Sequence, residues 1–335
     1  MDLVVADSAG ADLLWLSDFD LESEQGWGDG VDNTFDLAVR DPAAPLPEAA
    51  WRVYADGTDT GGLVTGYSVK SERTGLEVHW TGRTWCGVLA SRLLWPDAGK
   101  DYLTLSGDAN DVIRSVVSRL ELGSLFRVPA AAAGRGVSYR CSRDEPDAWT
   151  NLRLAMRSAG MRLSAVWAHG ACELSAVPVV DWGSRVDSDL MDFDIERDLL
   201  PVNHVLAAGK GELSKRQTAD AWADRDGFQT SKRAMAGVFE VELFHDASSS
   251  EGDDLREQAS DKLLGEQGGG SVSVTLRDEA GAALALGDLV TARRYAPNVE
   301  VTAEVSAAVA TASPAGAATS YKATPIGPAA IGKAR

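Results

Sequence analysis

Apolar and polar residues alternate along short stretches near the start of the chain. The clearest stretch is 75–82, where every second residue is apolar. A period of two is typical of a half-buried β-strand, because successive side chains point to opposite faces of the sheet. Two more apolar runs, 51–54 and 63–69, flank the turn-rich connector 56–62. Short strands joined by glycine-rich turns predict a small antiparallel barrel or sandwich within residues 1–100.

The spacing of apolar residues becomes helical in the next part of the chain. In 108–120 and again in 145–159 they recur every three or four residues, which places them on one face of a helix. Pro146 suits the first turn of the second helix, because its missing N–H needs no partner there. Two alternating runs within 161–177 then predict a hairpin. Residues 101–182 are therefore predicted to form a small α/β domain.

Strand-like patterns return in the remainder of the chain. The apolar run within 201–213 predicts a buried strand that ends at two glycines. Alternation resumes at 272–276 and at 299–306, and 287–290 lies between them as a turn that leads into a strand. Together these segments predict a second β domain over residues 183–311.

An insertion interrupts the second β domain near residues 214–270. Its first part, 214–250, is polar and predicts an irregular excursion with one strand at 237–244. Its second part predicts a short helix at 253–264, ended by a glycine-rich break. Residues 312–335 are rich in Ala, Gly, Pro and Ser, which predicts an extended or mobile C-terminal arm.

Composition narrows the classes of function. The 335 residues suffice for about two or three domains, and their formal net charge is −18. A protein that reads nucleic-acid sequence needs a basic face, so this charge argues against that class. A generic acidic surface is the simplest interpretation, although an acidic wall also lets DNA slide past without sticking. No apolar run approaches the roughly 20 residues of a bilayer span, and the acidic N-terminus lacks the basic start of a secretory signal. We predict no membrane insertion.

Histidine and cysteine residues form no recognised catalytic or metal-binding pattern. The four histidines are His79, His169, His204 and His245, and none lies in a zinc-protease motif. His204 lies between apolar residues of a predicted strand, which favours a hydrogen-bonded core histidine. The three cysteines, Cys86, Cys141 and Cys172, are scattered, as expected of small buried side chains in a reducing compartment. Cys86 has no assignable histidine and asparagine partners for thiol catalysis.

Acidic residues and tryptophans leave more room for interpretation. Glycosidases use paired carboxylates, and acidic pairs occur here at Asp18/Asp20, Glu22/Glu24, Asp192/Asp194 and Asp253/Asp254. In so acidic a chain such pairs are usually solvated. The ten tryptophans fit barrel cores and subunit interfaces, and a sugar-binding surface could also use some of them. We predict no catalytic, cofactor-binding or metal-binding residue, and hence no enzyme.

Several short motifs follow one another in a set order along most of the chain. They are D-T-G-G at 59–62, G-R-T-W-C-G-V-L at 82–89, Y-L-T-L-S-G at 102–107, N-H-V-L running into G-K-G-E-L over 203–213, and G-D-L-V at 287–290. In order and spacing, from about residue 15 to about residue 310, they resemble the tail hub proteins of siphophages that infect actinobacteria, a two-barrel class of baseplate hub. The residues that mark the resemblance are Gly61, Gly62, Arg83, Trp85, Asn203, His204, Gly209, Gly211, Gly287 and Asp288.

The resemblance implies an α+β, mostly β fold. Two antiparallel β-barrels like those of tail tubes would occupy residues 1–100 and 183–311, with the small α/β domain of 101–182 between them. Three copies would form a ring that presents six barrels, which adapts a hexameric tail tube to a trimeric tip.

The implied function is that of a virion structural protein, the baseplate or tail-tip hub of a long non-contractile tail, assembled in the bacterial host cytoplasm. Its partners would be a distal tail protein and tail fibre or tip proteins, with the tape measure protein and later DNA in the lumen. DNA would pass in transit, without sequence-specific binding. Two alternatives stay open, namely a tail-associated cell-wall hydrolase and a host-glycan-binding adhesion module.

Overall fold

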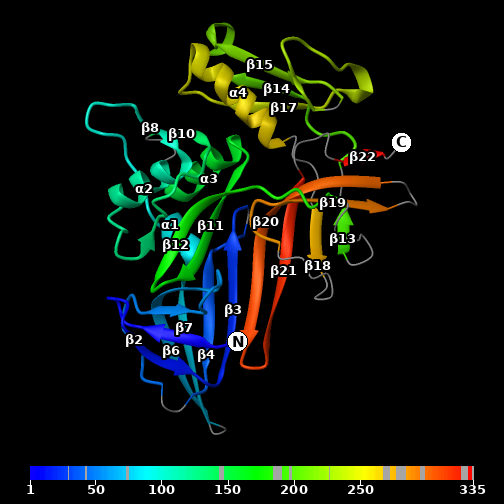
Figure 1. Ribbon diagram of the computed structural model, residues 1–335. Helices are drawn as coiled ribbons and strands as arrows, with labels where there is room; N and C mark the ends of the chain where they lie inside the picture. Colours follow the sequence, from blue (N-terminus) through cyan, green and yellow to red (C-terminus); the bar gives the residue numbers. More distant parts are fainter. Residues whose placement is uncertain are drawn as a thin grey trace. The chain divides into compact units, whose positions relative to one another are not determined.

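The computed structural model describes residues 1–28, 30–41, 44–72, 75–142, 147–183, 191–195, 198–225, 227–266, 272–276, 284–294, 299–325 and 331–333. The chain forms two compact units (Figure 1). Unit 1 consists of Met1–Trp182, Thr275–Leu289 and Val305–Lys322, and unit 2 consists of Gly183–Val274, Val290–Glu304 and Ala323–Arg335. Unit 1 therefore combines the predicted first β domain, the predicted α/β domain and part of the C-terminal region.

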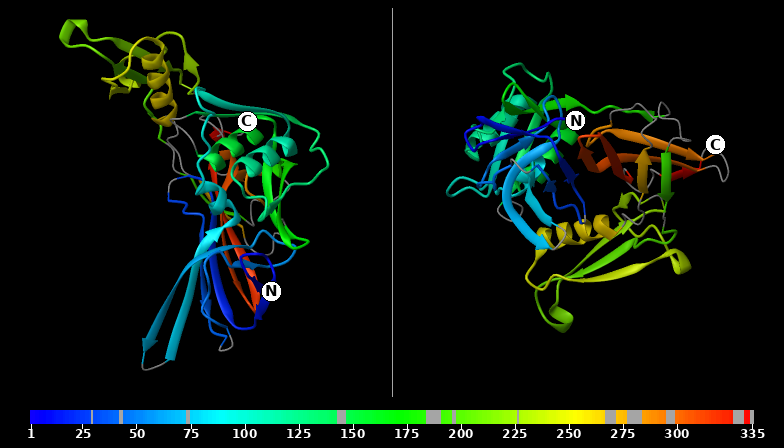
Figure 2. Two further views of the ribbon diagram at one scale, coloured as in Figure 1. Left: turned by 90° about the vertical axis from the view of Figure 1, so that its left-hand side faces the viewer. Right: turned by 90° about the horizontal axis from the view of Figure 1, so that it is seen from below.

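A large antiparallel sheet forms much of unit 1. Its N-terminal strands are β1 (Leu3–Ala6), β2 (Asp12–Leu16), β3 (Phe19–Gly26), β4 (Thr34–Val39), β5 (Arg52–Tyr54), β6 (Gly61–Glu72) and β7 (Gly75–Thr84). The spatial order runs β3-β4-β7-β6-β5-β1-β2, and each neighbouring pair is antiparallel. The long β6–β7 hairpin projects from the rest of the sheet (Figure 2). The strands predicted at 51–54, 63–69 and 75–82 are confirmed.

One face of this sheet carries a hydrophobic core. Trp80, Phe19 and Leu37 are fully buried, and the Trp51 ring packs edge-on against Trp80 at 6.1 Å. Each such side chain contributes about 1.5–3 kcal/mol by leaving water. Leu76, at the far end of the predicted alternation, is instead 65% exposed.

The described residues of the C-terminal region correct the expectation of an extended or mobile arm over 312–335. Strand β20 (Val299–Ser313) continues past that point, and β21 (Gly316–Pro325) lies beside it. Within unit 1, β20 pairs with β3 in antiparallel register from Ala307 to Ala312, and Ala312 belongs to the same core as Trp80. The alanine-rich composition indicated disorder, but small side chains also allow close strand packing, and main-chain pairing supplies the order.

A short helix that the sequence pattern did not predict follows directly after β7. Residues Trp85–Ala90 form α1, and Thr84 caps it by accepting a hydrogen bond from the Gly87 N–H. Nearly the whole helix is buried. A helix of six residues completes fewer than two turns, so its spacing of apolar residues could not be told from a buried strand.

The predicted α/β region is confirmed in its elements. They are β8 (Tyr102–Asp108), α2 (Ala109–Arg119), β9 (Phe126–Arg127), β10 (Gly136–Ser142), α3 (Ala148–Ser158), β11 (Met161–Ala168) and β12 (Ala171–Pro178). Asp108 caps α2, and α3 begins at Ala148 behind its cap Asp147, three residues later than expected. Pro146 lies outside the described residues. Helices α1, α2 and α3 share one hydrophobic core with the β11–β12 hairpin. Val4, Ala6 and Tyr54 also belong to this core.

Unit 2 contains a four-stranded sheet covered by a helix. The strands are β14 (His204–Ala208), β15 (Thr218–Ala223), β16 (Gln229–Thr230) and β17 (Glu242–Asp246), in the order β16-β15-β14-β17. The pair β14–β17 is parallel and the pair β14–β15 is antiparallel. Helix α4 (Gly252–Glu266) packs Leu255, Ala259 and Leu263 against this sheet (Figure 1).

The sheet of unit 2 corrects the expectation of a single strand within 214–250. Three short strands occupy that segment, and 237–244 is divided between a 3-10 turn, η4 (Gly237–Phe239), and β17. A second 3-10 turn, η3 (Leu213–Lys215), follows β14. Strands of two to six residues with few large apolar side chains carry too little pattern to be found from sequence.

The remaining strands are β13 (Met191–Ile195), β18 (Val272–Leu276), β19 (Leu289–Arg294) and β22 (Ile331–Lys333). Strands β19 and β22 each pair with β20. The strands expected at 272–276 and 299–306 are confirmed, and so is the turn before β19. The fold class is α+β and mostly β, as predicted. Among the described helices, none has the length and apolar character required to cross a bilayer.

Candidate functional site

The motif residues of the first half lie at the corner where β6, β7 and α1 meet. Gly61 has a φ of 143°, and a Cβ on it would lie 2.3 Å from the Val53 carbonyl oxygen. A Cβ on Gly62 would lie 1.9 Å from the carbonyl oxygen of Arg83. Trp85 is fully buried and stacks on a second tryptophan at 5.3 Å, whereas the Arg83 side chain is exposed. Three of these four residues therefore set strand spacing and packing.

Asp288 forms a buried anchor in unit 1. Its Oδ1 accepts hydrogen bonds from Arg162 Nε at 2.7 Å and from the Val180 N–H at 3.1 Å. Its Oδ2 accepts from Trp182 Nε1 at 3.2 Å and from the Ala285 N–H at 3.1 Å. The side chain of Asp288 is 1% exposed, so these four donors replace its water shell.

Gly287 allows this anchor to form. Its φ is 88°, a left-handed conformation that glycine adopts without strain, and a Cβ there would lie 2.9 Å from the Arg162 Cβ. The sequence predicted a turn at this point but gave no sign of the anchor, because Arg162 lies 126 positions away.

The motif residues of the second half gather in unit 2, around β14. Asn203 is buried, donates from Nδ2 to the Phe239 carbonyl at 2.8 Å and accepts at Oδ1 from the Val241 N–H at 3.1 Å. Gly209 and Gly211 follow β14, where a Cβ on either glycine would meet backbone atoms within 2.5 Å. All of these contacts hold loops against the sheet.

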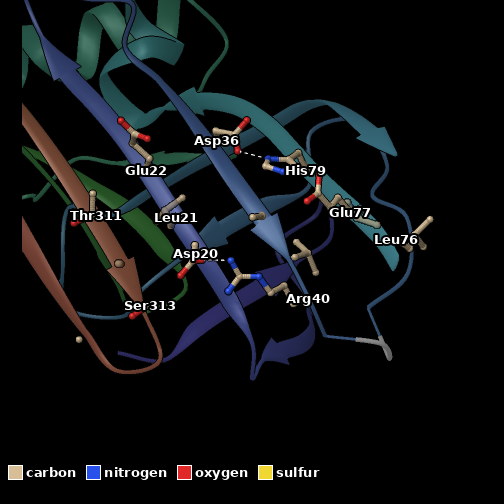
Figure 3. Close-up of a pocket in the computed structure, with 15 residues that line it drawn as sticks. Asp20, Leu21, Glu22, Asp36, Arg40, Leu76, Glu77, His79, Thr311 and Ser313 are labelled. Carbon is tan, nitrogen blue, oxygen red and sulfur yellow. Dashed lines mark hydrogen bonds and ion pairs between the residues drawn. The ribbon is translucent and has the colours of Figure 1, made fainter. Parts of the chain in front are cut away.

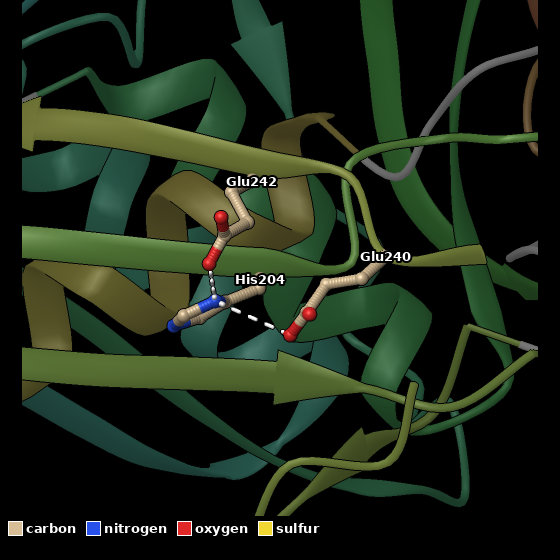
Figure 4. A group of neighbouring side chains, drawn as sticks. All are labelled: His204, Glu240 and Glu242. Carbon is tan, nitrogen blue, oxygen red and sulfur yellow. Dashed lines mark hydrogen bonds and ion pairs between the residues drawn. The ribbon is translucent and has the colours of Figure 1, made fainter. Parts of the chain in front are cut away.

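His204 lies at the first position of β14 among three carboxylates. Its Nδ1 is 2.9 Å from Glu242 Oε1 and 3.7 Å from Glu240 Oε1 (Figure 4). Its Nε2 is 2.8 Å from Asp220 Oδ1. The predicted hydrogen bonding is confirmed, but the predicted core position is wrong, because the core of unit 2 takes the neighbouring Val205 and leaves His204 half-buried. The sequence could not show the cluster, because it depends on the register of three strands. The Arg233 guanidinium hydrogen-bonds to Glu240 and lowers the pKa of that carboxyl.

A polar pocket of about 670 Å³ lies on the face of β3, β4 and β7 in unit 1 (Figure 3). Arg40 forms an ion pair with Asp20, and His79 Nδ1 lies 2.6 Å from Asp36 Oδ1. Both carboxylate side chains are 52% exposed. Two exposed acids, each with a basic partner, do not form the desolvated acid and free base of a glycosidase.

Several residues of the other acidic pairs also have structural roles. Glu24 forms an ion pair with Lys322 at 2.9 Å. Asp253 and Asp254 lie in the first turn of α4, where negative charge stabilises the helix. The side chains of Asp192 and Asp194 lie outside the described part of the chain.

The cysteines are free, and all three are buried, as predicted. Burial raises the pKa of the Cys86 thiol to about 12. A thiol that stays protonated at neutral pH is a poor nucleophile. The Cys86 Sγ lies 3.7 Å from Gln25 Oε1, which supplies no base for catalysis.

The aromatic residues divide between core and surface. Five of the ten tryptophans are buried in unit 1, namely Trp51, Trp80, Trp85, Trp149 and Trp167. Trp15 on β2 is 68% exposed, and the β6–β7 hairpin exposes Tyr67, Val69 and Leu76. Beside Leu76 lies an apolar pocket of about 280 Å³. The exposed apolar side chains of β2, β6 and β7 are candidates for contacts with other subunits.

Comparison with known proteins identifies the fold. No protein-family model matches the chain, and no curated protein sequence does. Among solved structures, the 43 kDa tail protein of prophage MuSo2 from Shewanella oneidensis is 11% identical with a TM-score of 0.56, and the match covers 99% of this chain and 100% of that protein. The tail protein from Neisseria meningitidis MC58 is 15% identical with a TM-score of 0.53, and the match covers 98% of both chains. Prophage tail protein gp18 from Listeria monocytogenes EGD-e is 12% identical with a TM-score of 0.52, covering 97% of this chain and 94% of that one.

These matches define the class: the chain has the fold of phage tail proteins. The similarity extends over both units. The structural neighbours are thus of the class that the motif resemblance predicted.

Proposed function

We propose that this chain is a structural protein of a phage tail, incorporated in the virion, and not an enzyme. The observation that carries the proposal is the fold match over 97–99% of the chain with proteins described as tail proteins. The candidate catalytic groups add support, because Asp20 and Asp36 of the polar pocket have basic partners and the Cys86 thiol is buried.

In its specific form, the proposal is a baseplate or tail-tip hub. Two tube-type β-barrels per chain would come from the sheet of unit 1 and from the strands around the first half of β20. Three chains would form a ring of six barrels that joins a hexameric tube to a trimeric tip. A distal tail protein would bind on one side and fibre or tip proteins on the other. The exposed apolar side chains of β2, β6 and β7 support subunit contacts at unit 1.

We further propose that the polar face of β3, β4 and β7 lines the channel for the tape measure protein and DNA. Four acidic residues outnumber two basic ones in the pocket on this face, and the whole chain has a net charge of −18. The acidic residues are Asp20, Glu22, Asp36 and Glu77, and the basic ones are Arg40 and His79. A negatively charged wall repels phosphates, so DNA would move through the ring without binding.

The assembly state of the purified chain tests this proposal. Native mass spectrometry and negative-stain electron microscopy are expected to show a trimer and a three-fold ring. The variant Leu76→Glu is expected to abolish the trimer, because it places a charge within an apolar contact. Leu264→Glu on α4 is the matched control, since Leu264 is also exposed, at 56%, but lies outside the proposed surface.

Other outcomes would count against the hub. A chain that stays monomeric at every concentration tested, or a trimer that Leu76→Glu leaves intact, contradicts the proposed interface. Clearing of actinobacterial cell walls in a zymogram would instead support the hydrolase alternative, and specific binding on an array of host wall glycans would support the adhesion module.

A further inference from the structure

The cluster around His204 is built on three neighbouring strands of unit 2. In the parallel β14–β17 pair, His204 lies directly opposite Glu242. In the antiparallel β14–β15 pair it lies opposite Trp222, two positions from Asp220. Val205 and Ala207 pack with α4 in the core, so alternation places His204 on the opposite face of the sheet. Glu240 precedes β17 and reaches the same point (Figure 4).

The distances suit one small cation. Zinc binds imidazole nitrogen and carboxylate oxygen at about 2.0–2.2 Å, so neighbouring ligand atoms around a tetrahedral ion lie roughly 3.3 Å apart. The distances from His204 Nδ1 to Glu242 Oε1 and to Glu240 Oε1, 2.9 and 3.7 Å, bracket that value. The candidate ligand atoms of these three residues all lie within 4.8 Å of one another. Small side-chain rotations would close them on an ion.

The contacts behind the histidine suit a metal ligand. Asp220 Oδ1 lies 2.8 Å from Nε2, and Glu242 Oε1 lies 2.9 Å from Nδ1. A metal ion bound at Nδ1 would take the place of any proton there, and Asp220 would then accept a hydrogen bond from the Nε2 N–H. A carboxylate behind the distal nitrogen is the usual support of a metal-ligating histidine. Trp222 stacks on the imidazole at 5.7 Å with an interplanar angle of 24°, which fixes the ring plane.

The glutamates are positioned as well. Asn203 binds the backbone on both sides of Glu240, through the Phe239 carbonyl and the Val241 N–H. Glu240 is 8% exposed and His204 13%, whereas Glu242 is 65% exposed and leaves a path from solvent. Two ligands are thus held in a desolvated position while the third can close over an ion.

The charge balance favours a divalent ion. The carboxylates of Asp220, Glu240 and Glu242 face one another, and Arg233 is the basic partner of Glu240. The three carboxylates and the one guanidinium place a net charge of about −2 around the imidazole. Arg233 donates to both oxygens of Glu240, including a 2.7 Å hydrogen bond from Nε to Oε1. A carboxylate oxygen has two lone pairs, so Oε1 would offer its second lone pair to the metal.

We propose that His204, Glu240 and Glu242 form a binding site for a divalent transition metal ion, with zinc as the probe and water as the fourth ligand. A mixed set of imidazole and carboxylate ligands suits zinc, whereas calcium and magnesium prefer oxygen ligands alone. Bound there, the ion links β14 to β17 and to the segment before it. The site is independent of the proposed tail function and is a structural clip in unit 2.

Zinc titration of the full chain tests the site. After treatment with a chelator, the wild-type chain is expected to bind one zinc ion by calorimetry and to gain thermal stability. His204→Gln and Glu242→Gln are expected to lower the affinity by at least about tenfold, and Asp220→Asn by about 10- to 100-fold through loss of the support behind His204. His79→Gln is the matched control, because His79 also contacts a carboxylate, Asp36, on a sheet face, and it is expected to bind zinc as wild type does.

A second measurement on the unmodified protein covers the case in which a variant fails to fold. Zinc is expected to shift the Nδ1 nitrogen resonance of one histidine of the four in the wild-type chain. No zinc uptake by the wild type, equal uptake by a folded His204→Gln, or a shift confined to another histidine would overturn the proposal. Calcium binding as strong as zinc binding would also overturn the proposal, because it would indicate a site of oxygen ligands without His204.

Discussion

At the scale of single residues, most of the motif side chains support backbone geometry. Asp288 is the clearest example. Its one carboxylate accepts hydrogen bonds from two backbone N–H groups and from two distant side chains of unit 1. The energetic consequence follows from its burial. The buried Asp288 carboxylate is satisfied by its four donors. Removing it would leave the half-buried Arg162 guanidinium and the Trp182 indole N–H without this partner.

We therefore predict that Asp288→Ala lowers the free energy of unfolding by about 3–5 kcal/mol, the usual cost of breaking a buried ion pair. Urea denaturation followed by tryptophan fluorescence measures the change. Asp20→Ala is the matched control, because it removes an ion pair of 52% exposed Asp20 with Arg40 and is expected to cost less than about 1 kcal/mol. Equal effects of the two substitutions would show that Asp288 is not an anchor.

At the scale of elements, the main difference from the sequence prediction is the pairing of β20 with β3. Its second half pairs with β3 although nearly 300 positions separate the two strands along the chain. Gly26 marks how close they come, since a Cβ there would lie 2.1 Å from the Ser306 carbonyl oxygen. The C-terminal segment is therefore part of the unit 1 core.

The β20 pairing predicts different outcomes for neighbouring residues. Ala312→Asp is expected to destabilise unit 1 by more than about 2 kcal/mol, because Ala312 is 6% exposed and the new carboxylate would be buried without a partner. Thr311→Lys is the control, since Thr311 is exposed and lies opposite Glu22, so it is expected to change stability by less than about 0.5 kcal/mol. Thermal unfolding of both variants checks this. If the Ala312→Asp variant is as stable as the control, the second half of β20 is not part of the unit 1 core.

The elements also show what a sequence can and cannot predict. Strong periodicity was sufficient for β7, α2, α3 and the β11–β12 hairpin, because each buries a face along its own length. Helix α1 was missed because six residues are too few to establish a period.

Contacts between distant segments were beyond prediction for a different reason. The Arg162–Asp288 pair depends on how two remote segments meet. The His204 cluster depends on a strand register that joins residues 16 to 38 positions apart. The residue types at these positions carry no local signal, so Asp220, Glu240 and Glu242 could not be selected from the many acids of the chain.

At the scale of the whole molecule, fold similarity extends much further than sequence similarity. Identities of 11–15% with the three tail proteins accompany matches over nearly their full length. In this chain, strand order and close packing depend on features that need few particular residues, such as alternation in β7 and glycines where backbones touch. Surface residues are not constrained in this way, which is why the proposed interface and the proposed metal site need direct tests.

The division into two units leads to a prediction about unfolding. Unit 1 has its own cores, and the sheet and helix of unit 2 have another. Because each unit buries its own apolar residues, we expect two transitions in differential scanning calorimetry. Leu263→Ala removes a fully buried side chain of α4 and is expected to cost about 2–5 kcal/mol in the unit 2 transition alone. Ala312→Asp is the reciprocal variant and is expected to shift only the unit 1 transition. A single transition that both substitutions lower equally would mean that the two units fold as one cooperative body.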